Sequence, residues 1–220
     1  MHLVDYDRVV DANWTTGLLT SVDDVDSLKT RVVAHRLEAL GHGTALVERR
    51  FDSRLQPQAD EPVLALAGFD DPAPRRVLDD RFQHAIDIGL GKTHTEFMDM
   101  LIHSFPSQLC AESAFEARAA RSRPLGAAYR TEFDRLVAAG VAPGQAQCGM
   151  LSLAGVTVAA AFIGATAGAL GVGGLLRTLH GGTDYAVIGL DMRTPEYIRV
   201  VPNTCPSADL NPGFTEVREY

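Results

Sequence analysis

Apolar and polar positions along the chain follow the periods of alternating strands and helices. Residues 63–69 form an unbroken apolar run of strand length, as expected for a parallel strand that is covered on both faces. Other apolar stretches bounded by polar or turn-forming residues predict further strands at residues 4–9, 44–51, 85–90 and 100–105. Together these strands predict a sheet against which the rest of the chain packs.

Between the strands, apolar residues recur at the helical period. In residues 28–40 they gather on one half of a helix, and Gly41 then provides a stop. Further helices are predicted just after Asp71 and at residues 112–120, 125–139 and 161–177, before a terminal hairpin of residues 184–191 and 197–201. The alternation predicts an α/β protein with a Rossmann-like, mostly parallel sheet, followed by a C-terminal small-residue helix and β-hairpin.

The stretch from residue 136 to residue 176 contains no charged side chain. Residues 156–176 are long enough to span a bilayer, and Gly164 and Gly168 form a G-x-x-x-G step. Alanine and glycine dominate this segment, however, and no cluster of lysines flanks it. A core helix that packs closely on a sheet or on a second subunit explains the small residues, and membrane insertion is the less favoured alternative.

Composition narrows the classes of function. The formal net charge is −8 with a pI near 5.3, and no lysine or arginine cluster is available for phosphates, which argues against nucleic-acid binding. The apolar run at the start is interrupted by Asp5 and Arg8, unlike a signal peptide. The cysteines form no C-x-x-C pair, which favours a reducing, cytoplasmic compartment and disfavours a cysteine zinc site: they are Cys110, Cys148 and Cys205.

Acidic and amide side chains follow the first predicted strand. Asp5 and Asp7 lie at its end, Asn13 comes six residues later, and Lys29 lies in the first turn of the next helix. An acid at the end of a parallel strand is where nucleotide-binding α/β folds hold ribose hydroxyls. A lysine at a helix start can reach a phosphate beside free backbone N–H groups. Taken singly, each residue also fits an ordinary role, since aspartates form turns and a surface lysine is a solvated cation.

The spacing of these residues is more informative than any one of them. It reads D-x-D-x-V-x-x-x-N, with a lysine sixteen residues after the asparagine, and the residues that match are Asp5, Asp7, Val9, Asn13 and Lys29. This pattern resembles the adenylating domain of the ThiF/MoeB/ubiquitin-activating superfamily.

Two further landmarks extend the resemblance along the chain. Phe69-Asp70-Asp71 with Arg75 looks like the family's aspartate after a buried strand, and the helix at residues 161–177 is similar to its late helix. The resemblance implies one ThiF-type domain over residues 1–220, made of a nucleotide-binding half (1–105), a helical crossover (106–150) and the late helix and hairpin (151–220).

Members of this superfamily use ATP and magnesium to adenylate the C-terminal carboxylate of a ubiquitin-like or sulfur-carrier protein. The resemblance implies that Asp5 binds ribose, that Asn13 and Lys29 contact phosphates, and that Asp70 holds magnesium. It also implies a carrier protein as partner and a homo- or heterodimer. Arg75, in contrast, is expected to be a structural partner of local carboxylates.

Cys148 is the candidate nucleophile. It precedes the late helix, where some family members place a cysteine that takes the activated acyl group, and a nearby helix N-terminus would favour its thiolate. The alternative is a small buried hydrophobe, which is the more usual role of a free cysteine.

Two features depart from the family pattern. The family's G-x-G-x-x-G loop precedes the D-x-D strand, whereas this sequence starts at that strand, and Thr16-Gly17 stands where the family has an Arg-Gln pair that helps to hold the triphosphate. The missing strand would be central, so two strand edges would lose their partner. Two functions stay open: an adenylyltransferase whose glycine loop is supplied from upstream or by another chain, and a non-catalytic subunit that partners an active enzyme.

Overall fold

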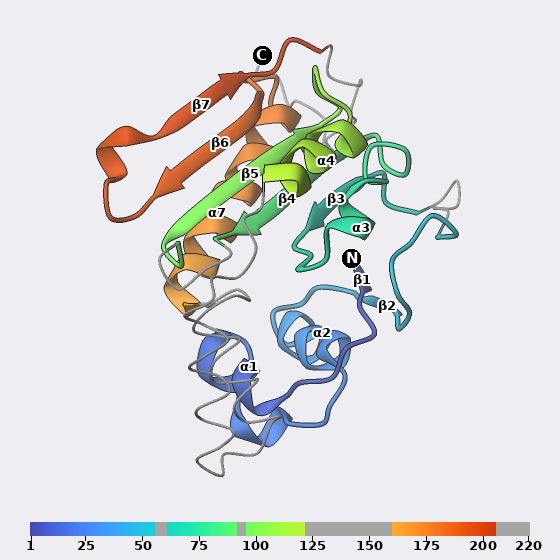
Figure 1. Cartoon of the computed structure of the whole chain (residues 1–220). Helices are drawn as coiled ribbons and strands as arrows, with labels where there is room; N and C mark the ends of the chain where they lie inside the picture. Colours follow the sequence, from blue (N-terminus) through green and yellow to red (C-terminus); the bar gives the residue numbers. More distant parts are fainter. Residues whose placement is uncertain (56–60, 92–95, 122–159, 206–220) are drawn as a thin grey trace, which may run out of the picture.

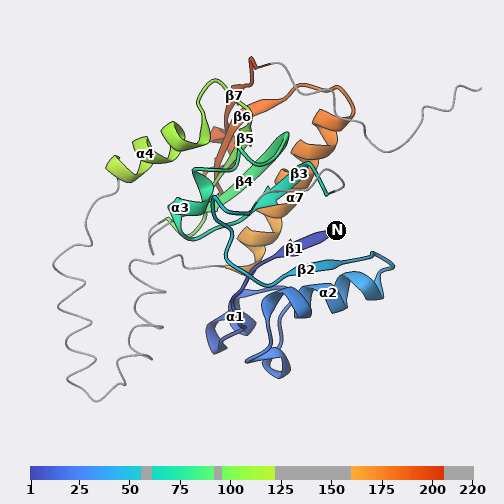
Figure 2. The same ribbon diagram turned by 90° about the vertical axis from the view of Figure 1, so that its right-hand side faces the viewer.

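The protein is an α/β structure with two sheets and helices on both faces of the larger one (Figure 1, Figure 2). The computed structural model describes residues 1–55, 61–91, 96–121 and 160–205. The predicted α/β class, the late small-residue helix and the terminal hairpin are all confirmed. The predicted helix at 125–139 lies outside the described residues.

The N-terminal part is a small parallel sheet covered by a helix. Strand β1 (His2–Val4) pairs in parallel with β2 (Ala45–Val47), and helix α2 (Lys29–Ala39) connects them. Helix α2 ends where expected, because Gly41 adopts φ 89°, which a residue with a side chain rarely does. Two short elements precede it, α1 (Asp11–Thr16) and the 3-10 turn η1 (Val22–Asp24).

The larger sheet has five strands in the order β3-β4-β5-β6-β7. They are β3 (Leu64–Ala67), β4 (His84–Leu90), β5 (Asp99–Phe105), β6 (Tyr185–Asp191) and β7 (Arg199–Pro202), with the 3-10 turn η2 (Pro195–Tyr197) between the last two. Only β3 and β4 are parallel, and the later neighbours are antiparallel. More strand pairs are antiparallel than the sequence predicts. Strands β4 and β5 pair in antiparallel because the link between them is too short for a parallel crossover.

Each sheet has an edge strand beside the other sheet, and this strand has one partner among the described residues. These strands are β1 and β3, which lie near each other in both views (Figure 1, Figure 2). Every residue of β3 is apolar, yet only Ala67 is buried. Parallel apolar strands are normally covered on both faces and paired on both edges. The two unpaired edges are those expected if a central strand is missing between β1 and β3.

Helix α7 (Ala161–Leu179) covers one face of the larger sheet, over β4 and β5. Its buried side carries Ile163 and Ala167, which pack with Met100. Farther along, Gly171 and Gly174 let the helix approach Ile86 and the neighbouring Ile88 closely. The small residues therefore serve contact with the sheet, as the core-helix interpretation predicts. By length and composition α7 is also apolar enough to cross a membrane, and its outward side exposes Phe162, Val172 and Leu176.

The opposite face of the sheet is covered by two helices and an aromatic core. The helices are α3 (Pro72–Arg75) and α4 (Ala111–Arg121). Between them and the sheet lie Leu78, Phe105 and Phe115, each at most 2% exposed. Phe51, from the connection after β2, joins the same cluster and stacks on Phe69 with ring centroids 5.3 Å apart. This cluster ties the smaller sheet to the larger one.

The close approach of α7 gives a first prediction. Replacing Gly171 with valine should lower the free energy of unfolding by about 1–3 kcal/mol through overpacking, since an added Cβ would lie 2.7 Å from Cδ1 of Ile88. Gly173→Ala is the matched control, because an added Cβ there meets nothing within 4 Å. The control should be stabilised by up to about 1 kcal/mol from helix propensity. Urea denaturation measures both, and a Gly171→Val variant as stable as the parent would contradict this packing.

Candidate functional site

Asp5, Asp7 and Lys29 meet at the carboxyl end of β1. The Nζ of Lys29 lies 3.0 Å from Oδ2 of Asp7, and the Lys29 backbone N–H donates to the Asp7 carbonyl at 2.9 Å. The backbone N–H of Asp7 in turn donates to Oδ1 of Asp5 at 2.9 Å. The structure therefore brings together two of the four residues expected to hold the cofactor, Asp5 and Lys29, with Asp7 between them.

This cluster is fixed in place by Val9 and accessible at its polar end. Val9 is fully buried, and its backbone exchanges hydrogen bonds with Asp26 and Ser27 ahead of α2. The side chains of Lys29 and Asp7 are 32% and 46% exposed. An ion pair this exposed contributes at most about 1 kcal/mol. Lys29 can consequently exchange the Asp7 carboxylate for another anion at small cost.

Asn13 has a local structural role in α1. Its side-chain Oδ1 accepts the backbone N–H of Val10 at 3.0 Å, which caps the start of the helix. Its carbonyl accepts from the backbone N–H of Gly17 and from the hydroxyl of Thr20. No hydrogen bond within the described residues joins Asn13 to Asp5 or Lys29. The side-chain amide N–H₂ group donates to no described residue and is the part of Asn13 that is left for a ligand.

Asp70 lies at the carboxyl end of β3, in an exposed turn. Its Oδ1 accepts the backbone N–H of Asp71 at 2.8 Å, and none of the described residues donates to its Oδ2. Asp71 is fully engaged, since it caps α3 through the backbone N–H of Ala73 and pairs with Arg50 at 2.6 Å. Asp70 makes no direct contact with the Asp5–Lys29 cluster.

An indirect connection between the two clusters comes from the core. Val4, which precedes Asp5, and Phe69, which precedes Asp70, pack on the same apolar cluster. The same apolar cluster therefore holds the ends of both β1 and β3. Asp5 and Asp70 follow these two strand ends, while Cys148 lies outside the described residues and stays a prediction.

A shallow hollow among the described residues lies beside this region. It is an open, polar depression of about 490 Å³ next to α2, lined by residues that include Arg8, Asp26, Arg31 and His35. None of the four expected cofactor residues lines it. This depression is therefore not a hollow that Asp5, Asn13, Lys29 and Asp70 share.

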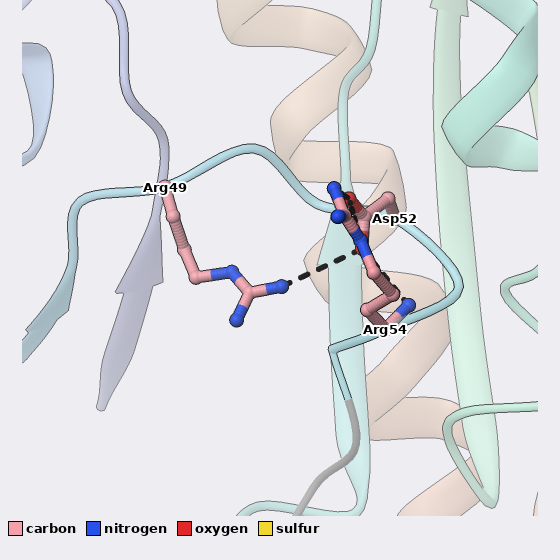
Figure 3. A network of polar contacts seen from close by, with 3 residues as sticks. All are labelled: Arg49, Asp52 and Arg54. Atoms are coloured by element: carbon pink, nitrogen blue, oxygen red, sulfur yellow. Dashed lines mark hydrogen bonds and ion pairs between the residues drawn. The ribbon is translucent and has the colours of Figure 1, made fainter.

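The connection after β2 is held by surface ion pairs. Asp52 accepts the guanidinium of Arg54 at 2.8 Å and lies 3.5 Å from that of Arg49 (Figure 3). These bonds, first of all the one from Arg54, lower the pKa of Asp52 to about 2. Because both carboxylate oxygens already have partners, this network serves to order the loop after Phe51.

A buried charged cluster lies between β4, β5 and α3, and Asp87 is its centre. Asp87 is completely buried, and Arg75 places Nη1 3.0 Å from its Oδ2. His103 faces Asp87 across the β4–β5 ladder, with Nδ1 3.8 Å from the same oxygen. Arg75 is therefore confirmed as a structural partner of a carboxylate. The prediction for residues 85–90 did not single out Asp87, although one carboxylate in an apolar strand requires a buried partner.

The fold is that of an E1-like protein of the ThiF superfamily. MccB from E. coli matches the whole chain at 14% identity with a TM-score of 0.56, over 59% of MccB. A structure of MccB with ATP matches 94% of the chain at 13% identity with a TM-score of 0.54, over 58% of MccB. Identities this low show a shared fold only.

The chain belongs to the BilD C-terminal domain family, whose sequence profile matches residues 1–182. A relative is the bacterial E1-like protein BilD of Collimonas sp. (strain OK412), which is 36% identical over 187 residues. The match covers 84% of this chain and 40% of the relative, so the chain spans less than half of the relative's length.

The buried imidazole of His84 gives a second prediction. His84 is 2% exposed, and its Nε2 has no hydrogen-bond partner among the described residues. Burial lowers the pKa of His84, and the nearby Asp184 opposes this only in part. Below the unfolded-state pKa of 6.5 the unfolded chain binds a proton that the folded chain does not bind. The free energy of unfolding therefore decreases as the pH is lowered.

The slope from His84 should reach about 1.4 kcal/mol per pH unit between pH 6.5 and its folded-state pKa. Thermal or urea unfolding between pH 7.5 and 5.5 measures it. His84→Gln should flatten this part of the profile, whereas the control His42→Gln, at an exposed position, should not. Identical profiles for the parent and both variants would contradict the expectation.

Proposed function

We propose that this chain forms part of an E1-like adenylyltransferase that uses ATP to activate the C-terminal carboxylate of a ubiquitin-like or sulfur-carrier protein. The family and the fold support an adenylyltransferase-type protein. The observation that carries the proposal is the joined cluster of Asp5, Asp7 and Lys29 at the end of β1. Its residues stand at the spacing of the superfamily motif and offer acceptors for ribose beside a cation for phosphate.

In the proposed reaction a carboxylate oxygen of the carrier protein attacks the α-phosphorus of ATP. The bond from that phosphorus to the bridging oxygen of the β-phosphate breaks, and pyrophosphate leaves with the electron pair. Negative charge grows on the phosphate oxygens, and a preorganised cation stabilises it. Lys29 supplies this cation after it leaves Asp7, Asp5 accepts ribose hydroxyls, and the amide N–H₂ of Asn13 donates to a phosphate oxygen.

Asp70 is the residue that would hold magnesium. Among the described residues, no three His, Cys, Asp or Glu side chains converge as a metal cage. One carboxylate nevertheless fits, because Mg²⁺ is commonly held by one or two carboxylates together with substrate phosphates and water. The ion, when bound, neutralises charge on the phosphates, and Asp70 offers Oδ2 for it.

A glycine-rich strand and turn would complete this site, and the fold leaves a suitable place for it. The edges of β1 and β3, which pair with no further strand in the described part of the chain, offer backbone groups to one extended segment that would merge the two sheets. We propose that this segment comes from the same polypeptide upstream or from a partner chain. Cys148 as acyl acceptor, a dimer and a cytoplasmic location belong to the same proposal.

The enzyme proposal is tested by ATP–pyrophosphate exchange with a panel of ubiquitin-like proteins. Asp70→Ala and Lys29→Gln should each lower the exchange rate by about 100-fold or more, because each removes charge stabilisation at the phosphates. Asp80→Ala, at an exposed position outside the cluster, is the matched control and should leave the rate unchanged. If calorimetry detects no ATP binding by the chain alone, catalysis by the chain without a completing segment is excluded.

A non-catalytic subunit is the second candidate, and the turn after α1 favours it. A Cβ on Gly17 would lie 2.6 Å from the hydroxyl oxygen of Thr20 and 2.8 Å from the carbonyl of Asn13. This turn has no room for the glutamine that the superfamily places there, and Thr16 supplies no cation for the triphosphate. The chain would then pair with an active enzyme through its free strand edges.

Light scattering after gel filtration tests the second candidate. The chain should form a stable heterodimer with a co-encoded activating enzyme and raise that enzyme's exchange rate, while Asp70→Ala in this chain has no effect. A chain that stays monomeric with every co-encoded partner would contradict a subunit role. A strong effect of Asp70→Ala on the exchange rate would instead support the enzyme proposal.

A further inference from the structure

The buried cluster around Asp87 reaches the proposed magnesium site through a single side chain. Arg75 donates through Nη1 to Asp87 inside the sheet and through Nη2 to the carbonyl of Phe69, the residue before Asp70. We propose that the Arg75–Asp87 pair is a positioning device that fixes the turn presenting Asp70. Only the identity of the ligand that Asp70 binds rests on the proposed function.

The Asp87 end of the device is fixed by the sheet. Asp87 lies within β4, opposite Ala67 of β3 and His103 of β5, and none of its side chain is exposed. A buried carboxylate that loses its guanidinium partner leaves an uncompensated charge inside the protein, which is strongly unfavourable. The buried Asp87 therefore fixes the position of the Arg75 guanidinium.

The guanidinium is held from a second side by an aromatic ring. Its Cζ lies 5.6 Å from the centroid of Phe115, which comes from α4 and is 2% exposed. A cation over a ring face is attracted by the ring's quadrupole, and the planar guanidinium then has few orientations left. With Nη1 on Asp87 and the face on Phe115, Nη2 is directed at the Phe69 carbonyl.

The turn that receives this bond is short and locally bonded. The backbone N–H of Asp71 donates to Oδ1 of Asp70, and the N–H of Ala73 donates to Oδ1 of Asp71. These two bonds fix the shape of the turn but do not attach it to the sheet. Arg75 adds a hydrogen-bonded attachment to the packing of Phe69 on the apolar cluster, so the direction of the free Oδ2 of Asp70 is set from inside the core.

A merely structural ion pair makes a different prediction from a positioning device. Arg75→Lys keeps a cation for Asp87 but loses the planar fork that donates in two directions. The double variant Arg75→Met/Asp87→Leu leaves no buried charge unpaired, and such apolar replacements are often neutral or stabilising. A positioning device loses control of the turn in both variants, whereas a structural pair leaves the turn unchanged if the fold is intact.

The test follows the backbone amides of Asp71 and Ala73 by NMR hydrogen exchange, alongside thermal unfolding. Both variants should speed exchange at these amides by about tenfold, the value of one lost hydrogen bond. Arg54→Lys is the matched control, because it alters an arginine–aspartate pair on the surface and should leave the turn unchanged. Unchanged exchange in a folded double variant would overturn the inference.

Magnesium dependence of ATP–pyrophosphate exchange provides the functional readout. Arg75→Lys should raise the KM for magnesium about tenfold and leave kcat within threefold, since the residue acts through Asp70. Adding Arg75→Lys to Asp70→Asn should cause no further loss, because coupled residues are not additive. Additive losses would overturn positioning. If the parent lacks exchange activity, the proposed function falls, while the amide measurement still decides the inference.

Discussion

The coverage of β4 on both faces is the constraint on which the larger sheet depends. This strand receives α7 on one side through Ile86 and Ile88, and α3 and α4 on the other side through Ala85 and Asp87. A charged group on a strand so enclosed is costly unless a partner within the protein compensates it. Asp87 can be accommodated only because Arg75 reaches it, and Arg75 can reach it only from a helix that starts directly after β3. Arg75 thus connects the core to the turn that carries Asp70.

The sequence identifies elements well where a single local signal decides the structure. The helix predicted over residues 28–40 ends at its glycine, and the late helix appears within a few residues of its expected bounds. Predictions were less accurate where local side chains compete with the ladder. The strand predicted over residues 4–9 ends at Val4, because the Asp5 carboxylate takes the N–H of Asp7 and turns the chain.

Long-range contacts explain most of what the sequence could not predict. The antiparallel pairing of β5 with β6 depends on which strands become neighbours, and an apolar run does not encode that choice. The same holds for the site. The spacing of Asp5 and Lys29 in the sequence predicts that they lie close together, since they lie at the end of one strand and the start of the helix that follows. The local bonds of Asn13 and the burial of Asp87 appear only once the chain is folded.

The edges of β1 and β3 that have no partner strand among the described residues have a consequence for the chain in solution. Rows of free backbone donors and acceptors beside apolar side chains are templates for further strands, and natural proteins usually blunt them with charges, bulges or prolines. None of the residues in β1 or β3 is a lysine, an arginine or a proline. A preparation in which nothing covers these edges is therefore prone to aggregate through them. Good solubility would in turn indicate that the edges have found a partner.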